Sequence, residues 1–298
     1  MRVVVETPLA LTSFFQVVER NGEIGARGGG FILHTPLKTV VKEGKGKVII
    51  NGEKVKDSTS GKALSLFFKE NYPSKGVDVV HEVPVPIGAG FGTSGSGALG
   101  AVIGASILLS GPEDYYRLAR YAHDAEIIMR TGLGTVSSIS SMPTGAGLLI
   151  EPGPPGKAVF LPLIFNEEPY RILYIVFSSK STKKVLSSKK AVERLSKAGE
   201  KALNTVERDP KLEILLSAAR KFAEECGIVE RHLLSLSDRL REMGALGAAP
   251  NMIGDAVHAL IERDKALGVL RKLKVLYPNA HIGTSRIGKG YVKIKALR

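Results

Sequence analysis

The spacing of apolar residues predicts a mixture of strands and helices in the first half of the chain. Alternating and β-branched stretches are typical of strands, whereas an apolar residue at every third or fourth position is typical of a helix. Pro84 and Pro86 break the short apolar run that begins at His81, which favours the end of an edge strand. We expect strands at 2–6, within 7–18, at 31–35 and at 77–83, a hairpin over 40–55, and helices over 61–72, 98–109 and 113–129.

The second half of the chain has a different pattern. Residues 171–177 form an apolar run that predicts a central strand, and apolar residues at helical spacing follow it. Helices are expected around 191–202, 212–226, 230–243 and 264–276, and the strands at 281–286 and 290–296 are expected to be joined at Gly288. A strand, then helices, then paired strands suggests an α+β second domain. Because the composition shifts near Pro162, we expect one domain over 1–162 and another over 163–298.

Composition and charge narrow the classes of partner. The chain has 298 residues, 44% of them hydrophobic, and no tryptophan, so we expect an aliphatic core. The net charge of +13 suits an anionic ligand such as ATP, but it is also typical of nucleic-acid binding. Basic residues are scattered except at 180–190, and the chain has neither an RNP-like aromatic motif nor Cys/His zinc spacing. We therefore expect a solvated basic surface with a cleft that attracts anions, and no nucleic-acid partner.

The chain carries few signals for a special compartment. Cys226 is the single cysteine, so no disulfide within the chain is expected. The N-terminus lacks the layout of a signal peptide, and no apolar run reaches transmembrane length. These features favour a soluble cytoplasmic protein with no membrane partner.

The glycine-rich stretch GAGFGTSGSGALG at 88–100 precedes an apolar helix and predicts an anion site. Glycines let the backbone approach a phosphate, and a helix start offers unpaired N–H groups and a positive dipole. The chain has no Walker A loop, and the match to G-x-G-x-x-G is weak because no acid follows at the required distance. Tight helix packing is the simpler explanation for the glycines, but it leaves the three hydroxyls unexplained. The candidate phosphate-binding residues are Gly88, Gly90, Gly92, Thr93, Ser94, Gly95 and Ser96.

The next predicted helix carries a candidate metal ligand, Glu126. His123 lies three positions earlier, so the two side chains share a helix face. On spacing alone, an exposed ion pair between Glu126 and Arg130 is the favoured interpretation for Glu126. For His123, a hydrogen bond to a backbone carbonyl and a functional role are equally plausible.

These motifs resemble those of the GHMP kinases, a family that includes galactokinase, homoserine kinase and mevalonate kinase. The run P-x-x-x-G-x-G-x-G-T-S at 84–94 is similar to their ATP-binding motif, and residues 88–100 look most like the archaeal pantoate kinase branch. The resemblance implies a two-domain α+β fold, with a ribosomal S5 domain 2-like N-terminal lobe and a ferredoxin-like C-terminal lobe. It also implies that ATP and Mg²⁺ are the cofactors and that substrate binds between the lobes.

The resemblance assigns roles to particular residues. The run A-H-D-A-E followed by T-G-L-G, at 122–134, is similar to a pantoate kinase pattern, in which His123 would touch substrate while Glu126 and Ser94 hold Mg²⁺. The chain departs from the pattern at Thr135, where relatives have an acid as the presumed base. It also has Glu151 where relatives have a substrate-binding arginine, so Arg27 or Arg130 is expected to replace that arginine.

The resemblance therefore predicts an ATP-dependent kinase that phosphorylates a hydroxyl of a small hydroxy acid. Pantoate, converted to 4-phosphopantoate in coenzyme A biosynthesis, is the best single candidate, with Glu126, Ser94 and Thr135 as catalytic residues. Three alternatives stay open: a mevalonate-type or homoserine-type kinase, a non-catalytic nucleotide-binding paralogue, and a nucleic-acid-binding protein. Whether the chain forms a homodimer is also left open.

Overall fold

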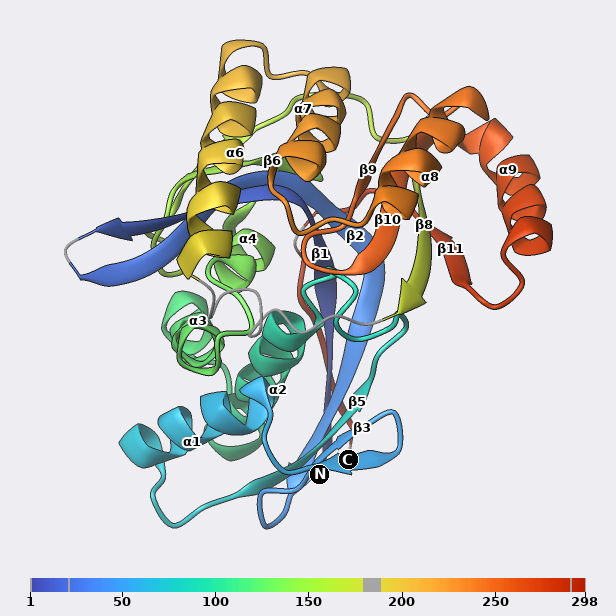
Figure 1. Ribbon diagram of the computed structural model, residues 1–298. Coiled ribbons are helices and arrows are strands. Elements are labelled where there is room, and N and C mark those ends of the chain that lie inside the picture. Colours follow the sequence, from blue (N-terminus) through green and yellow to red (C-terminus); the bar gives the residue numbers. More distant parts are fainter. Residues whose placement is uncertain (1, 21, 179–188, 290, 298) are drawn as a thin grey trace.

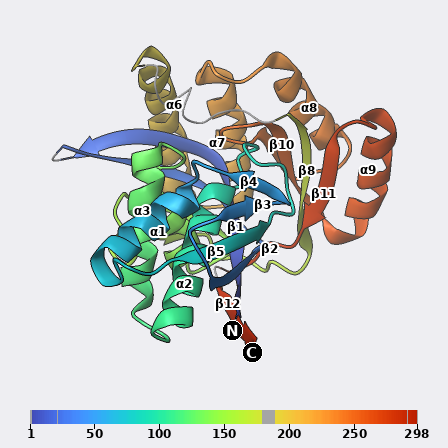
Figure 2. The same cartoon turned by 90° about the horizontal axis from the view of Figure 1, so that it is seen from below.

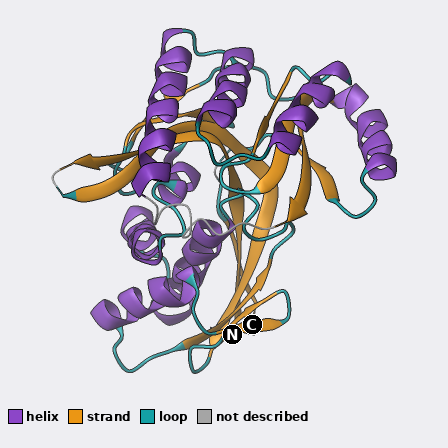
Figure 3. Ribbon diagram, in the orientation of Figure 1, coloured by secondary structure: helices purple, strands orange, loops and turns teal. Residues whose placement is uncertain are grey.

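The computed structural model describes residues 2–20, 22–178, 189–289 and 291–297, which form two β-sheets with helices packed against them (Figures 1 and 3). The basic stretch at 180–190 falls mostly outside these residues. The α+β class expected from the sequence is confirmed by this arrangement. Within the described residues, no helix combines the length and apolar character needed to cross a lipid bilayer.

A long antiparallel hairpin, β1 (Arg2–Arg20) with β2 (Glu23–Glu43), forms the axis of the molecule (Figure 1). The sequence predicted separate short strands here, and this prediction was wrong. Register shifts between Pro8 and Leu9 and between Thr12 and Phe14 let one strand bend without ending. The glycines lie inside β2, and no larger residue fits at these positions because a Cβ at Gly28 or Gly30 would collide with the backbone of β1. They allow close strand approach rather than a turn.

The remaining strands of the first sheet join this hairpin on both sides. The path runs β12-β1-β2-β5-β3-β4, and β6 and β7 extend from the distal part of β2. The strand β5 lies between β2 and β3, so the prediction of an edge strand was wrong, although both prolines do lie beyond its end. The bounds are β3 (Val48–Ile50), β4 (Glu53–Val55), β5 (Val77–Glu82), β6 (Ala146–Glu151), β7 (Val159–Pro162) and β12 (Lys293–Leu297).

Helices α1 (Thr59–Asn71), α2 (Thr93–Leu109) and α3 (Tyr115–Met129) cover one face of this sheet, as the view from below shows (Figure 2). The central helix α2 is apolar on nearly every side and is buried between the sheet and its two neighbours. It begins at Thr93, five positions before the expected start, because its first turn contains the small residues that the hydrophobic pattern did not count. A short helix that the sequence did not predict, α4 (Thr135–Ser141), follows α3.

The second sheet has the strand order β11-β8-β10-β9 and is antiparallel. This β-α-β-β-α-β arrangement is ferredoxin-like, with three helices in place of the first. The middle of β8 is a continuous apolar run because both of its faces are buried: Ile172 and Tyr174 face the hairpin side, whereas Leu173 and Ile175 face the outer helices. The bounds are β8 (Tyr170–Ser178), α6 (Lys189–Arg208), α7 (Leu212–Glu225), α8 (Arg231–Glu242), β9 (Gly247–Pro250), β10 (Asp255–Glu262), α9 (Arg263–Leu276) and β11 (His281–Ser285).

The two last strands do not pair with each other, contrary to the sequence prediction. The strand β11 pairs with β8 in the second sheet, whereas β12 returns to the first sheet beside β1. The domain boundary expected at 162 stays a prediction. The first sheet's β7 ends at Pro162 and the second sheet's β8 begins at Tyr170, but the chain ends in the first sheet.

Candidate active site

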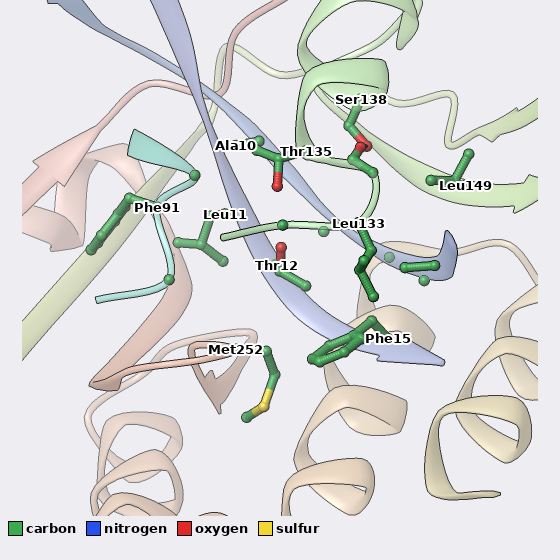
Figure 4. Close-up of a pocket in the computed structure, with 18 of the residues that line it drawn as sticks. Ala10, Leu11, Thr12, Phe15, Phe91, Leu133, Thr135, Ser138, Leu149 and Met252 are labelled. Carbon is green, nitrogen blue, oxygen red and sulfur yellow. The ribbon is translucent and has the colours of Figure 1, made fainter. Parts of the chain in front are cut away.

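A cavity lies where the hairpin, the start of α2 and the second sheet's 251–254 loop meet (Figure 4). Its walls come from segments far apart in the sequence: 10–15 of β1, 26–32 of β2, the glycine loop, 131–135, and Met252 with Ile253. The cavity is therefore a product of the tertiary fold.

The glycine loop forms one end of this cavity. Gly88, Gly90 and Gly92 all have positive φ, of 78°, 79° and 64°. Alternating left-handed residues turn successive N–H groups toward one side, which makes a concave anion-binding surface. Gly92 is the N-cap of α2 and supplies no side chain to cap it, so the first N–H groups of the helix are left for a ligand.

Space at the helix start is too tight for larger residues. A Cβ at Gly92 would lie 2.6 Å from Thr135 Cγ2 and 3.0 Å from the Ala10 carbonyl oxygen. At Gly95 it would lie 3.1 Å from Glu126 Oε2. Because they have no side chain, these two glycines let the loop, Thr135 and Glu126 lie close together.

The hydroxyls of the glycine loop have different surroundings. Thr93 and Ser94 line the cavity, as the sequence predicted for phosphate or metal ligands. Ser96 is fully buried, and its hydroxyl lies 2.8 Å from Thr7 Oγ1 and donates to the Pro8 carbonyl at 2.9 Å. Its backbone N–H bonds to Gly92 within the helix. Ser96 thus holds α2 against β1, and its hydroxyl does not face the cavity, so the sequence-based assignment of Ser96 as a phosphate ligand is not supported.

Glu126 is buried, with only 1% of its surface exposed, so it is not the surface ion pair that spacing favoured. Its Oε1 accepts a hydrogen bond from the Val136 backbone N–H at 3.2 Å. Its Oε2 has no hydrogen-bond partner among the described residues and points toward Gly95 and Gly132. Arg130, the expected partner, is exposed at the end of α3. A buried carboxylate oxygen left unpaired is costly unless a cation or ligand completes it.

His123 supports Glu126 rather than facing the cavity. It is buried, and its Nδ1 lies 3.4 Å from both Glu126 Oε1 and Ser137 Oγ. Glu126, His123 and Arg130 are all absent from the described residues that line the cavity.

Among the described residues that line the cavity, Arg27 is the one that carries a positive charge. Its Nε donates to the Ile150 carbonyl at 2.7 Å and its Nη2 lies 3.3 Å from Glu207 Oε1 on α6. These two contacts fix the guanidinium at the cavity wall and leave further N–H donors for a substrate carboxylate.

The fold brings Thr135, which the resemblance had singled out, into the cavity together with several residues that the sequence did not identify. Figure 4 shows the hydroxyls of Thr12 and Thr135 directed into the same space, beside an apolar wall that includes Phe15, Leu133 and Met252. Thr12 lies within an apolar run of β1 and carries no local signal of a binding role. Only the bend of the hairpin places it opposite Thr135.

Comparisons with known proteins find relatives of this chain in sequence and in structure. Residues 58–140 match the family described as GHMP kinases N terminal domain. The chain is 31% identical over 296 residues to a pantoate kinase of Thermococcus kodakarensis, covering 94% of this chain and 95% of that protein. It is 26% identical to a pantoate kinase of Methanocaldococcus jannaschii, covering 90% and 96%. A solved structure described as a phosphotransferase related to the CoA biosynthesis pathway has 26% identity, covers 99% of both chains and gives a TM-score of 0.85.

Proposed function

The chain belongs to the GHMP kinases and, within them, to the pantoate kinases, and from this premise we propose that it transfers the γ-phosphoryl group of ATP to a hydroxyl of pantoate. The product would be 4-phosphopantoate. The relative described as related to CoA biosynthesis suggests the pathway that this product enters. We place the reaction in the cytoplasm, without a nucleic-acid or membrane partner.

The observation that carries this proposal is the uncapped start of α2 beneath three left-handed glycines. Phosphoryl transfer depends mainly on holding the phosphates and neutralising their charge. Backbone N–H groups at a helix start do both without a lysine. This explains why the chain needs no Walker A motif.

The residues around Glu126 fit a bound Mg²⁺. The unpaired, buried Oε2 is a hard ligand, and Ser94 lies on the adjoining turn of α2. The described residues contain no cluster of three or more His, Cys, Asp or Glu side chains for a metal. One carboxylate with nucleotide phosphates is a common way to hold Mg²⁺, which keeps several waters. When bound, the ion would neutralise charge that develops on the transferred phosphate.

The cavity wall also fits the shape of pantoate, which carries a carboxylate, two hydroxyls and two methyl groups on one carbon. Arg27 supplies a cation for the carboxylate, so we propose it as the replacement for the missing family arginine. Phe15, Leu133 and Met252 offer apolar surface for the methyl groups. The exposed Arg130 is less suited to this role.

Thr135 is proposed to orient the acceptor hydroxyl. A threonine hydroxyl cannot serve as a general base near neutral pH, so the acceptor's proton would pass to the transferred phosphate. Positioning and electrostatic stabilisation account for most of the catalysis in such reactions. The site is therefore compatible with activity despite the absence of the family's acid.

The test is a substrate panel with radiolabelled ATP and Mg²⁺, including pantoate, mevalonate and homoserine. We expect phosphorylation of pantoate at a rate well above that of the other acceptors. Arg27→Ala should raise KM for pantoate by ~10²-fold or more, as expected for losing a charge-assisted pair. KM for ATP should not change, and Arg27→Lys should recover only part of the loss. Preferred phosphorylation of another acceptor, or of none, would contradict the proposal.

A further inference from the structure

A buried chain of polar side chains connects the second sheet to the glycine loop. His258, on β10, has no exposed surface, and neither do its partners Ser13 and Asn251. Its Nε2 lies 2.9 Å from Ser13 Oγ on β1, and its Nδ1 lies 3.0 Å from Asn251 Oδ1. Asn251 Nδ2 then donates to the carbonyl of Ala89, inside the glycine loop, at 2.8 Å.

The direction of every hydrogen bond in this chain is fixed. Burial lowers the pKa of the His258 imidazole to about 3, so the ring is neutral near pH 7 and has one donor and one acceptor nitrogen. Because the amide nitrogen of Asn251 donates to Ala89, its oxygen must accept from His258 Nδ1. His258 Nε2 is then the acceptor, and the Ser13 hydroxyl donates to it. A rotated Asn251 amide would place its oxygen against the Ala89 carbonyl oxygen and lose that hydrogen bond.

The backbone around Asn251 also presses against the glycine loop. A Cβ at Gly254 would lie 2.6 Å from the Ala89 carbonyl carbon, and one at Gly90 would lie 2.8 Å from Asn251 Cβ. The Met252 N–H donates to the Thr12 carbonyl at 2.9 Å, and this hydrogen bond joins the 251–254 segment to β1. Residues 251–254 thus pack directly against the glycine loop and support it.

We propose that Asn251 and His258 are positioning residues that hold the glycine loop in its anion-binding conformation through the Ala89 carbonyl. The proposal rests on the proposed function, since it takes the glycine loop to be the phosphate site. Ala89 lies between Gly88 and Gly90, whose left-handed conformations direct the N–H groups. With its carbonyl anchored, the peptide units on either side cannot rotate freely. Through His258 and Asn251, the second sheet thereby influences the affinity for nucleotide of a site whose walls come mainly from the first sheet and its helices.

The first experiment measures nucleotide affinity by calorimetry with ATP and no acceptor, in wild type, His258→Leu and Asn251→Ala. We expect both variants to bind ATP ~10-fold more weakly, as for the loss of one buried hydrogen bond. His258→Asn keeps a donor near the Nδ1 position and should restore most of the affinity. In kinetics, KM for ATP should rise while kcat and KM for pantoate change little, because the loop binds phosphates in ground and transition states alike.

His81 provides a matched control for loss of a buried histidine. It is 2% exposed, and its ring nitrogens lie 2.9 Å from Thr39 Oγ1 and from Ser60 Oγ. Its ring packs against Gly97, inside α2, and not against the Ala89 carbonyl that Asn251 anchors. His81→Leu should lower Tm about as much as His258→Leu while leaving ATP affinity unchanged. Correctly folded His258→Leu and Asn251→Ala proteins with wild-type ATP affinity would overturn the proposal, as would an equal loss of affinity in His81→Leu. If wild type itself bound no ATP, the proposed function would fail first, and the two failures are distinguishable.

Discussion

Glu126 has the most informative surroundings of any single residue in the site. Its carboxylate is buried beside His123, the Val136 N–H and the start of α2, with one oxygen unpaired among the described residues. Thr135 lies beside the same region, since a Cβ at Gly95 would meet both Glu126 Oε2 and Thr135 Cβ. Each residue gives a prediction about chemistry rather than about folding.

Glu126→Gln should reduce turnover by ~10²-fold or more, because it removes the charge that we assign to holding Mg²⁺. The change is nearly isosteric, so Tm should fall little, and ATP binding without metal should be almost unchanged. Steady-state kinetics over a range of Mg²⁺ concentrations measure the effect. Glu200→Gln, at an exposed position of α6, is the control. A Glu126→Gln enzyme with a near wild-type rate would remove the metal-binding role from this residue.

Thr135 variants test whether this position orients the acceptor or once held a base. Thr135→Ala should lower kcat modestly, by ~10-fold, because positioning is lost but no base is removed. Thr135→Ser keeps the hydroxyl and should retain most activity, and Thr135→Asp should be tolerated or faster. Steady-state kinetics on pantoate compare the three. A wild type that is inert while Thr135→Asp is active would instead indicate a decayed site.

At the scale of elements, the junction between the glycine loop and α2 determines the site. The helix needs no polar face, since it is buried on all sides, and its uncapped first turn faces the cavity. The same junction touches β1 at Ala10, α3 at Glu126 and α4 at Thr135. Packing and ligand binding therefore constrain the same glycines.

Gly92→Val should abolish detectable ATP binding while leaving most of the fold intact. A side chain at this position would collide with Thr135 and Ala10 and would strain a left-handed backbone. Gly46→Val is the matched control, since Gly46 also has positive φ but has open space around it. Calorimetry with ATP and circular dichroism of both variants measure binding and fold. Equal loss of binding in the two variants would show that backbone strain, not the site, explains the result.

Among the described residues, His81 and His258 are buried histidines whose pKa values are lowered by burial, and this couples the stability of the protein to pH. Burial lowers the pKa of His81 to about 4 and that of His258 to about 3, and their polar partners are uncharged. In the unfolded chain both rings take up a proton near pH 6.5, but in the fold they stay neutral until the pH is much lower. Acidification therefore favours the unfolded state.

The free energy of unfolding should be highest above pH 6.5 and should fall as the pH drops toward 4. At pH 5 each histidine should cost about 2 kcal/mol relative to neutral pH. Urea denaturation at pH 7 and pH 5 measures the loss. His81→Leu should reduce the pH dependence while lowering stability at pH 7. A free energy of unfolding that is flat between these pH values would contradict the buried, neutral state of the rings.

The net charge of the whole chain gives a further test. Because the basic residues are dispersed, we expect no tight complex with duplex DNA or structured RNA near physiological salt. Binding that appears only at low salt and weakens steeply as salt rises would be non-specific counterion release. Filter binding across a salt series measures this. A saturable complex that persists at physiological salt would favour a nucleic-acid function.

The sequence by itself determined the local features. Apolar spacing identified most helices and the central strand β8, since these patterns depend on neighbours within one or two turns. The glycine and hydroxyl residues before α2 indicated an anion site, because a helix start exposes its N–H groups wherever it occurs in a fold. The motif resemblance supplied Glu126, which spacing alone had assigned to the surface.

The tertiary structure decided everything that depends on distant segments. Ser13 and His258 are 245 positions apart, yet they lie within hydrogen-bonding distance. Local periodicity carries no signature of the continuous hairpin or of the return of β12 to the first sheet. It also does not indicate that the Thr12 and Thr135 hydroxyls are directed into the same space. Ser96 has the same residue type as Ser94 two positions away, but only the packing of β1 removes its hydroxyl from the cavity. Side-chain periodicity reports which residues are buried, whereas the packing of one sheet against another decides what each buried residue meets.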